Sequence, residues 1–226
     1  QYMSKGAGFF REFAEAQTPR VTVVTCADSR VQSPAFDATP ENDDFTVRNI
    51  GNQLESSLGS VQYGVEHLNT PVLLILGHTG CGAVKAALGD TRSLQDPLRR
   101  ELSGLHLKKL KGAVDDKRWA DAVVENVHDQ VRAGLKQFGA RVNAGELTIV
   151  GAVYDFRNDL SKGTGKLSVI NVNGVQDEAR LKAFGDAIMT TPNPRAPGKK
   201  ESSLDKLARA LANSVVPSEL HSDDGP

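Results

Sequence analysis

The sequence predicts an α/β fold, in which a mainly parallel β-sheet is flanked by helices and ends in an antiparallel edge strand. Short runs of β-branched and apolar residues, at 20–26 and 71–77, are typical of strands that are buried on both faces. Along the chain such runs alternate with segments whose apolar residues recur at helical spacing. Strands and helices that alternate in this way form parallel sheets with helical crossovers.

The first half of the chain is expected to supply three strands and three helices. Aromatic residues on one face predict the first helix, and apolar residues three or four apart predict the second. The strands are β-branched or apolar runs, and the second and third are followed by glycine turns. In order, these elements are a helix over 6–17, a strand over 20–26, a strand within 43–53, a helix over 57–68, a strand over 71–77 and a helix over 81–88.

The second half begins with a charged, lysine-rich segment, 90–117, which we expect to be helical and largely solvated. A longer amphipathic helix is predicted over 119–138. Two strands, 146–156 and 165–174, are separated by a polar turn, so we expect them to pair as an antiparallel hairpin. This hairpin would supply the antiparallel edge strand, and another short helix is predicted over 176–186.

A Pro-rich stretch divides the chain into two unequal parts. We expect residues 1–187 to form one α/β domain. Residues 188–226 are expected to form a linker and a helical tail, with an amphipathic stretch at 204–215.

Composition and charge argue against several classes of partner. The chain has 27 basic and 28 acidic side chains, so neither nucleic acid nor an anionic membrane is an expected partner. No apolar run approaches the roughly 20 residues that span a bilayer. The expected compartment is the cytoplasm. The periplasm and an organelle are the alternatives, because a chain that begins at Gln1 can have been processed.

Residues 75–84, with the sequence ILGHTGCGAV, pass from a strand to a helix and allow two interpretations. The glycines match the pattern of a phosphate-binding dinucleotide loop, and Asp96 lies at about the distance of a ribose ligand. However, Asp96 does not end a predicted strand, and this interpretation leaves His78 and Cys81 without a role.

A metal site is the second interpretation, and it uses both of these side chains. A thiolate and an imidazole three residues apart can ligate one ion if Gly80 permits a tight turn between them. Cys26 also ends a predicted strand, and ligands of parallel sheets gather beyond the carboxyl ends of the strands. Cys26, His78 and Cys81 form a donor set that zinc favours, and three protein ligands leave the fourth position open, as in catalytic sites.

Asp28 and Arg30 follow Cys26 closely and could serve such a site. A carboxylate beside a metal can accept a hydrogen bond from bound water, while Arg30 would orient it and keep it ionised. Asp28 could also bind the metal directly, which would close the site.

Four segments, in the same order, resemble the β-class carbonic anhydrases: CADSRV, FTVRNIGN, VQYGVEHL and LGHTGCGAVKA. The resemblance covers about residues 9–174 and implies the β-carbonic-anhydrase fold for a zinc-binding catalytic domain. It implies that Cys26, His78 and Cys81 bind one zinc ion per chain. The other implied site residues are the catalytic pair Asp28 and Arg30 and the substrate-binding positions Gln17, Phe45, Ile50, Tyr63 and Gly82.

The activity implied by the resemblance is the reversible hydration of carbon dioxide to bicarbonate and a proton by zinc-bound hydroxide. The implied working unit is a homodimer or a dimer of dimers, with the substrate cleft at the subunit boundary. Hydrolysis of carbonyl sulfide or carbon disulfide on the same site is one alternative, because both molecules are linear with an electrophilic carbon. A zinc-containing scaffold or sensor without turnover is the second alternative.

The sequence departs from the family pattern near the first cysteine. Bicarbonate-regulated bacterial members carry a tryptophan where this chain has Val23, and the only tryptophan here, Trp119, lies far away in sequence. The sequence therefore does not predict this form of regulation.

Overall fold

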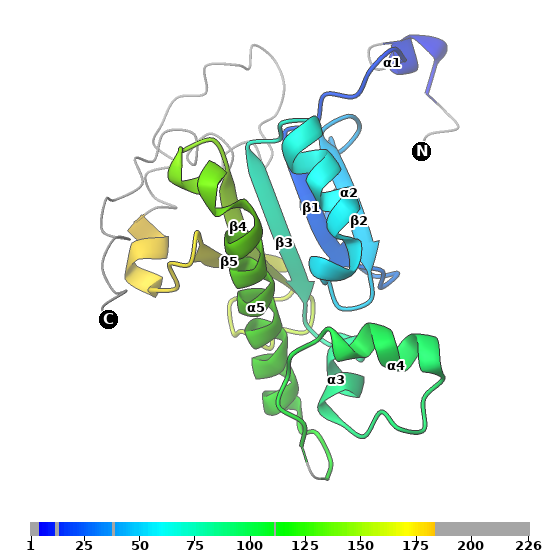
Figure 1. Cartoon of the computed structure of the whole chain (residues 1–226), viewed down its shortest axis with the longest axis vertical. Coiled ribbons are helices and arrows are strands. Elements are labelled where there is room, and N and C mark those ends of the chain that lie inside the picture. Colours follow the sequence, from blue (N-terminus) through cyan, green and yellow to red (C-terminus); the bar gives the residue numbers. More distant parts are fainter. Residues whose placement is uncertain (1–4, 12–13, 38, 111, 184–226) are drawn as a thin grey trace.

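A computed structural model describes residues 5–11, 14–37, 39–110 and 112–183. Its core is a five-stranded sheet with the order β2-β1-β3-β4-β5 (Figure 1). Strands β2, β1, β3 and β4 are parallel, and β5 runs antiparallel to β4 at one edge, so the predicted fold class is confirmed. In chain order the strands are β1 (Val21–Cys26), β2 (Asp44–Asn49), β3 (Val72–His78), β4 (Thr148–Asp155) and β5 (Lys166–Val172).

The strands β1 and β3 form the interior of the sheet. Every residue of both is buried, which explains why their sequences show continuous apolar and β-branched runs instead of alternation. Cys26 at the end of β1 is level with Asn49 of β2, and His78 at the end of β3 is level with Tyr154 of β4. The carboxyl ends of four strands therefore meet at one edge.

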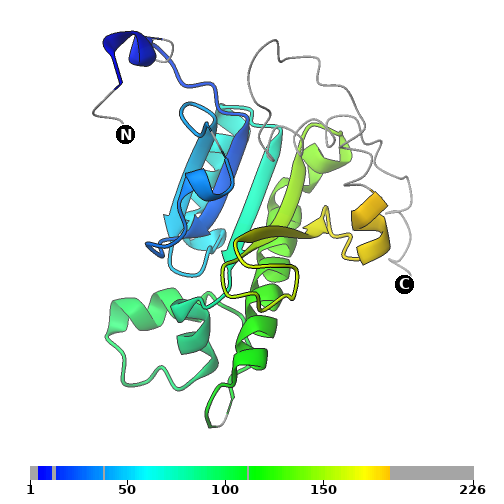
Figure 2. The ribbon, with the colours of Figure 1, turned by 180° about the vertical axis from the view of Figure 1, so that it is seen from behind.

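The long helix α5 lies along β3 and β4 on one face of the sheet, and α2 lies beside it over β1 and β2 (Figure 1). Figure 2 shows the opposite face, which is crossed by the segment that contains the short turn η2. The helices are α1 (Ala7–Arg11), α2 (Leu58–Gln62), α3 (Gly82–Leu88), α4 (Asp96–Ser103) and α5 (Asp116–Asn143). The shorter helical turns are η2 (Ser33–Ala35), η3 (Glu55–Ser57) and η4 (Tyr63–His67).

Helix α5 approaches the sheet closely because β4 carries a glycine at the contact. A Cβ atom at Gly151 would lie 2.9 Å from side-chain carbons of both Val127 and Val131, which is closer than packed carbons tolerate. The helix begins after Asp115, whose side chain accepts a hydrogen bond from the Arg118 N–H and so caps the first turn. Its first residues lie near the carboxyl ends of the strands (Figure 1).

The segment 90–117 agrees with the prediction only in part. Among its described residues, Asp96–Ser103 form helix α4, and the last two residues already belong to α5, which begins at Asp116. Leu102, Leu105 and Leu107 are buried and join the hydrophobic core. Most of the described residues of the segment are exposed, so the prediction that it is largely solvated is confirmed. The prediction that it is helical holds only in part, because a few leucines spaced among charged residues anchor a largely non-helical chain to the protein.

Other element boundaries shift without changing the architecture. Among the described residues of the first predicted helix, 6–17, only Ala7–Arg11 are helical. The predicted helix over 57–68 contains a π-helical turn in its second half, and α5 extends beyond 119–138 at both ends.

The C-terminal part of the chain lies largely outside the described residues. Residues 178–183 are helical, within the helix predicted over 176–186. The predicted linker and tail at 188–226 are outside the described part. No helix in the described part is both long and apolar enough to cross a membrane.

Candidate metal centre

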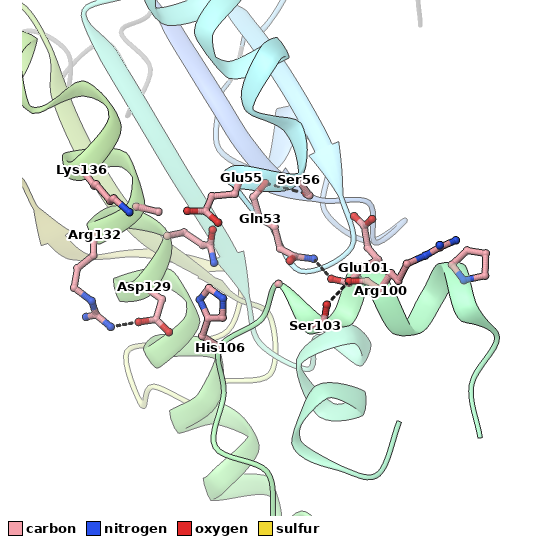
Figure 3. A pocket seen from close by; sticks show the side chains of 14 residues that line it. Gln53, Glu55, Ser56, Arg100, Glu101, Ser103, His106, Asp129, Arg132 and Lys136 are labelled. Atoms are coloured by element: carbon pink, nitrogen blue, oxygen red, sulfur yellow. Dashed lines mark hydrogen bonds and ion pairs between the residues drawn. The ribbon is translucent and has the colours of Figure 1, made fainter. Parts of the chain in front are cut away.

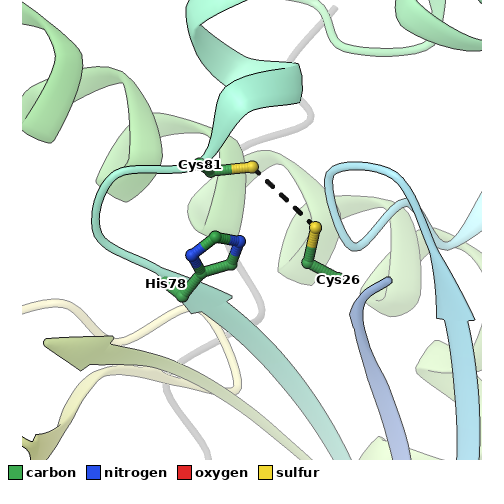
Figure 4. Close-up of side chains that lie close together, drawn as sticks. All are labelled: Cys26, His78 and Cys81. Carbon is green, nitrogen blue, oxygen red and sulfur yellow. Dashed lines mark hydrogen bonds between the residues drawn. The ribbon is translucent and has the colours of Figure 1, made fainter. Parts of the chain in front are cut away.

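Two strand ends and one turn bring a histidine and two cysteines together. Cys26 ends β1, His78 ends β3, and Cys81 precedes the first residue of α3. Their ligand atoms all lie within 4.8 Å of one another, and the Cys26 and Cys81 sulfur atoms are 4.0 Å apart. Figure 4 shows the three side chains converging on one space. All three are buried, so the donor atoms are shielded from bulk water.

Gly80 shapes the turn between His78 and Cys81. Its φ angle is +67°, in the left-handed region that glycine adopts without strain. A Cβ atom at Gly80 would also lie 2.9 Å from the Cδ atom of Arg157. The glycine thus allows both the tight turn and the close approach of the Arg157 side chain to it.

The histidine is oriented as a metal ligand would be. Its Nδ1 donates a hydrogen bond of 3.0 Å to the Thr79 carbonyl, since a carbonyl can only accept. This bond leaves the lone pair on Nε2. That atom is buried, has no hydrogen-bond partner, and lies within the group formed with the two sulfur atoms. A buried nitrogen without a partner is costly unless something else satisfies it, and a metal ion fits this donor set.

The pKa values of the two cysteines are shifted in opposite directions. The Cys81 thiol donates a hydrogen bond to Cys26 and lowers the pKa of Cys26, with help from the Gly51 N–H at 3.4 Å. The Cys26 thiolate and burial raise the pKa of Cys81. A divalent cation would reverse the second shift, because it stabilises both thiolates at once.

Asp28 and Arg30 form a paired fork beside this group. Arg30 donates from Nε to Oδ1 at 2.9 Å and from Nη2 to Oδ2 at 2.7 Å. This guanidinium holds the pKa of Asp28 well below its usual range. Oδ2 of Asp28 is 3.8 Å from Nε2 of His78, beyond hydrogen-bond distance. The carboxylate thus faces the three donor atoms while Arg30 restrains it.

The predicted substrate-binding residues lie at two different ends of the sheet. Ile50 is next to Gly51, whose N–H contacts Cys26, and Gly82 begins α3 directly after Cys81. These two positions therefore flank the three donor atoms. Their predicted role in substrate binding stays a prediction.

Gln17, Phe45 and Tyr63 lie toward the opposite end. Phe45 is level with Thr22, four residues before the end of β1, which corresponds to about 13 Å along the strand. The Phe45 and Tyr63 rings are 5.7 Å apart, and Gln17 is exposed before β1 begins. Their predicted role in the cleft also stays a prediction.

Two aromatic residues near the group were not predicted. Phe156 stacks on His78 with ring centroids 5.6 Å apart, and its ring lies 4.6 Å from the Arg30 guanidinium carbon. It directly follows β4, so the rule that strand ends meet at one edge could have identified it. The indole Nε1 of Trp119 donates a hydrogen bond of 2.8 Å to the Cys81 carbonyl. No spacing signal connects Trp119 with a residue 38 positions away.

A separate open groove lies between α4, α5 and the segment that leads into α2 (Figure 3). Its volume is about 900 Å³, and neither the three donor residues nor the fork line it. The charged residues on its walls are Glu55, Arg100, Glu101, Asp129, Arg132 and Lys136. Acidic and basic side chains are mixed there, so the groove shows no preference for a ligand of one charge.

Comparison with known proteins agrees with this arrangement. The carbonic anhydrase family model matches residues 21–162. Carbonic anhydrase 2 of Mycobacterium tuberculosis is 31% identical over 165 residues, which cover 68% of this chain and 78% of the relative.

Solved β-carbonic anhydrases have the same fold. The Coccomyxa enzyme, in complex with acetazolamide, matches with 26% identity and a TM-score of 0.61, over 80% of this chain and 85% of that one. A structure from a study of two tetrameric enzymes of Sordaria macrospora matches with 20% identity and a TM-score of 0.59, over 72% of this chain and 86% of that one. The chain therefore belongs to the β-carbonic anhydrase family of enzymes.

Proposed function

We propose that this chain hydrates carbon dioxide reversibly to bicarbonate and a proton, with one zinc ion held by Cys26, His78 and Cys81. The observation that carries the proposal is the buried Nε2 of His78, which has no partner and faces two sulfur atoms beside the Asp28–Arg30 fork. Membership of the β-carbonic anhydrase family supports the same activity.

A zinc ion in such a site supplies Lewis acidity, which makes water a competent nucleophile near neutral pH. The residues of the chain prepare the site for it. The Thr79 carbonyl fixes the His78 tautomer, and the Gly51 N–H supports the Cys26 thiolate.

Asp28 and Arg30 would orient the attacking water. Asp28 accepts a hydrogen bond from that water and thereby turns a lone pair toward the carbon of carbon dioxide. Arg30 engages both carboxylate oxygens and also donates to the Gly80 carbonyl at 3.1 Å. This restraint keeps the carboxylate from becoming a fourth metal ligand, which would block the reaction.

We further propose that a second copy of the chain completes the substrate cleft with Gln17, Phe45 and Tyr63. Within one chain, Phe45 lies about 13 Å along the sheet from the donor atoms, too far to contact a substrate held there. Tyr63 is 44% exposed, so part of its surface is available to a partner. The matched Sordaria enzymes are tetrameric.

The test is stopped-flow hydration of carbon dioxide by zinc-loaded protein, together with the zinc content per chain. We expect one zinc per chain and a rate far above that of buffer. His78→Ala should lose both, whereas His106→Ala, which changes an exposed histidine away from the donor group, should lose neither.

Two results would contradict the proposal. One is zinc-loaded protein without hydration activity. The other is protein that releases hydrogen sulfide from carbonyl sulfide or carbon disulfide but does not hydrate carbon dioxide.

A further inference from the structure

The outer side of the Gly80–Cys81 turn is covered by a residue from a distant part of the chain. Trp119, in the first turn of α5, donates its indole N–H to the Cys81 carbonyl at 2.8 Å. The same carbonyl accepts the Lys85 N–H at 3.1 Å. The peptide that follows Cys81 is therefore held by both α3 and α5.

Two cations hold the indole ring itself. The Lys85 Nζ lies 4.3 Å from the ring centroid, and the Arg157 guanidinium carbon lies 4.8 Å from it. Arg157 is anchored in turn by Asp116, with its Nη2 3.1 Å from the carboxylate, and its own stem covers Gly80. Trp119, Lys85 and Arg157 together form what we call the outer bracket of the turn.

Cys81 needs such support more than the other two donor residues. Cys26 and His78 belong to strands β1 and β3, whose ladders fix their backbones. Cys81 lies beyond the end of β3, and Gly80 before it can adopt many backbone conformations at little cost. The outer bracket supplies the restraint that the sheet does not supply.

We propose that Trp119 is a positioning residue of the metal centre, which holds the Cys81 peptide so that its sulfur points toward Cys26 and His78. This inference rests on the proposed zinc site. The indole N–H acts through the Cys81 backbone and touches neither substrate nor metal. Loss of this hydrogen bond should loosen one of three donor atoms and speed the release of the ion.

A purely structural role for Trp119 predicts a different outcome. If the ring only packs α5 against α3, then Trp119→Phe, which keeps an aromatic face for Lys85 and Arg157, should change little. If the hydrogen bond positions Cys81, the same variant should release zinc faster, because phenylalanine has no N–H group that could hold the Cys81 carbonyl. The decisive readout is therefore the rate of zinc release and not the melting temperature.

The experiment measures zinc release from the zinc-loaded full chain into an excess of a chromophoric chelator. We expect Trp119→Phe to release zinc on the order of tenfold faster, which is within the range seen when groups that support metal ligands are changed. Arg157→Gln should also accelerate release, to a smaller extent. Phe138→Leu is the matched control, because Phe138 is a buried aromatic of α5 outside the bracket and its loss destabilises the protein generally.

The outcomes separate this inference from the proposed function. If the wild-type chain binds no zinc, the proposed function fails first. If it binds zinc and hydrates carbon dioxide, but Trp119→Phe releases zinc at the wild-type rate, only the present inference is overturned. Equal acceleration in Phe138→Leu would also overturn it, because general loosening would then explain the effect.

The wild-type chain offers a second readout. Trp119 is its only tryptophan, so intrinsic fluorescence reports on this ring alone. We expect the emission to shift as zinc leaves, in step with the chelator signal. An emission that stays unchanged during zinc release would show that the bracket and the metal site are not coupled, and the inference would fail.

Discussion

The two ends of the sheet differ in what one chain can build by itself. At the carboxyl end, Cys26, His78 and Cys81 are buried and lie within one small group. At the amino end, Gln17 and Tyr63 are exposed and no comparable group is present among the described residues. A single chain thus assembles the candidate metal-binding group, whereas the proposed cleft residues lie apart from it, which is why we assign them to a site shared with a second copy.

Two aspartates show the same contrast electrostatically. Asp28, at the carboxyl end, is paired with Arg30, and its pKa is lowered. Asp44, at the amino end, has no hydrogen-bond partner for either oxygen. Burial, together with the charge of Asp37, raises the pKa of Asp44 to about 7. Asp28 therefore stays ionised beside the three donor atoms, whereas Asp44 lies away from them and its resistance to ionisation bears on stability.

The largest expected effect comes from comparing substitutions at the two ends of strand β1. Cys26→Ala removes a donor atom at the carboxyl end of β1 and should lower the hydration rate at least about 100-fold, because even changes in groups that support a metal ligand cost this much. Zinc content should fall with it. Val21→Ala, at the amino end of the same buried strand, should cost stability but keep zinc and activity. Equal retention of zinc in both variants would contradict the assignment of the metal site.

Asp28→Asn should have the next largest effect. The amide keeps the shape of the side chain but cannot orient water as a charged acceptor, so kcat/KM should fall about 100-fold. Zinc content should remain at one per chain. Asp44→Asn is the matched control and should leave kcat/KM unchanged. A similar loss of kcat/KM in both variants would contradict a specific role of Asp28 in orienting water.

Mixing two inactive variants tests whether the two ends meet in one site across copies. Cys26→Ala lacks the metal end, and Gln17→Ala/Phe45→Ala lacks the proposed cleft end. In a hybrid dimer one site would carry both defects and the other none, so an equal mixture should regain about a quarter of wild-type activity. The measurement is stopped-flow hydration after joint refolding. Activity no higher than that of the separate variants would contradict a site shared between two copies. The metal end and the cleft residues would then act within one chain.

The smallest expected effect concerns stability at the amino end. The unfolded chain ionises Asp44 near its ordinary value of 3.8, whereas the folded chain keeps the proton until about pH 7. The folded state therefore loses stability as pH rises through this interval, since only the unfolded chain has given up its proton. Asp44→Asn should raise the free energy of unfolding by about 1 to 2 kcal/mol at about pH 8 and change it little at about pH 4.

Urea denaturation at both pH values measures this difference. Asp90→Asn is the control, because Asp90 forms an exposed pair with Arg92 and should not affect stability measurably. An equal change at both pH values would show that ionisation of Asp44 is not the cause.

The sheet and the donor group could be predicted because both follow local rules. Cys26 and His78 each end a buried run, and the ends of parallel strands meet at one edge, so residues 52 positions apart could be brought together from their sequence patterns alone. Gly80 signalled the turn to Cys81. These signals depend on backbone geometry that a short segment determines by itself.

The rest depends on how elements pack, which short patterns do not encode. Leu102, Leu105 and Leu107 lie among charged residues, so the sequence pattern does not indicate that they are buried. Their burial follows from the contacts that the segment makes with the core. Trp119 reaches Cys81 because α5 lies along β3 and β4 at a distance that Gly151 permits. Nothing in the spacing of Trp119 and Cys81 reports that distance.

The two thiols of the donor group have a consequence for the redox chemistry of the metal-free chain. Their sulfur atoms are 4.0 Å apart and are not joined. If the two sulfur atoms moved about 2 Å closer, a two-electron oxidant could join them in a disulfide, with the loss of two electrons and of the proton that the thiol still carries. One such event would remove two of the three donor atoms. Chain kept without metal in air should therefore lose its capacity for zinc and regain it with a thiol reductant, so the ion that serves the reaction would also protect its own site from oxidation.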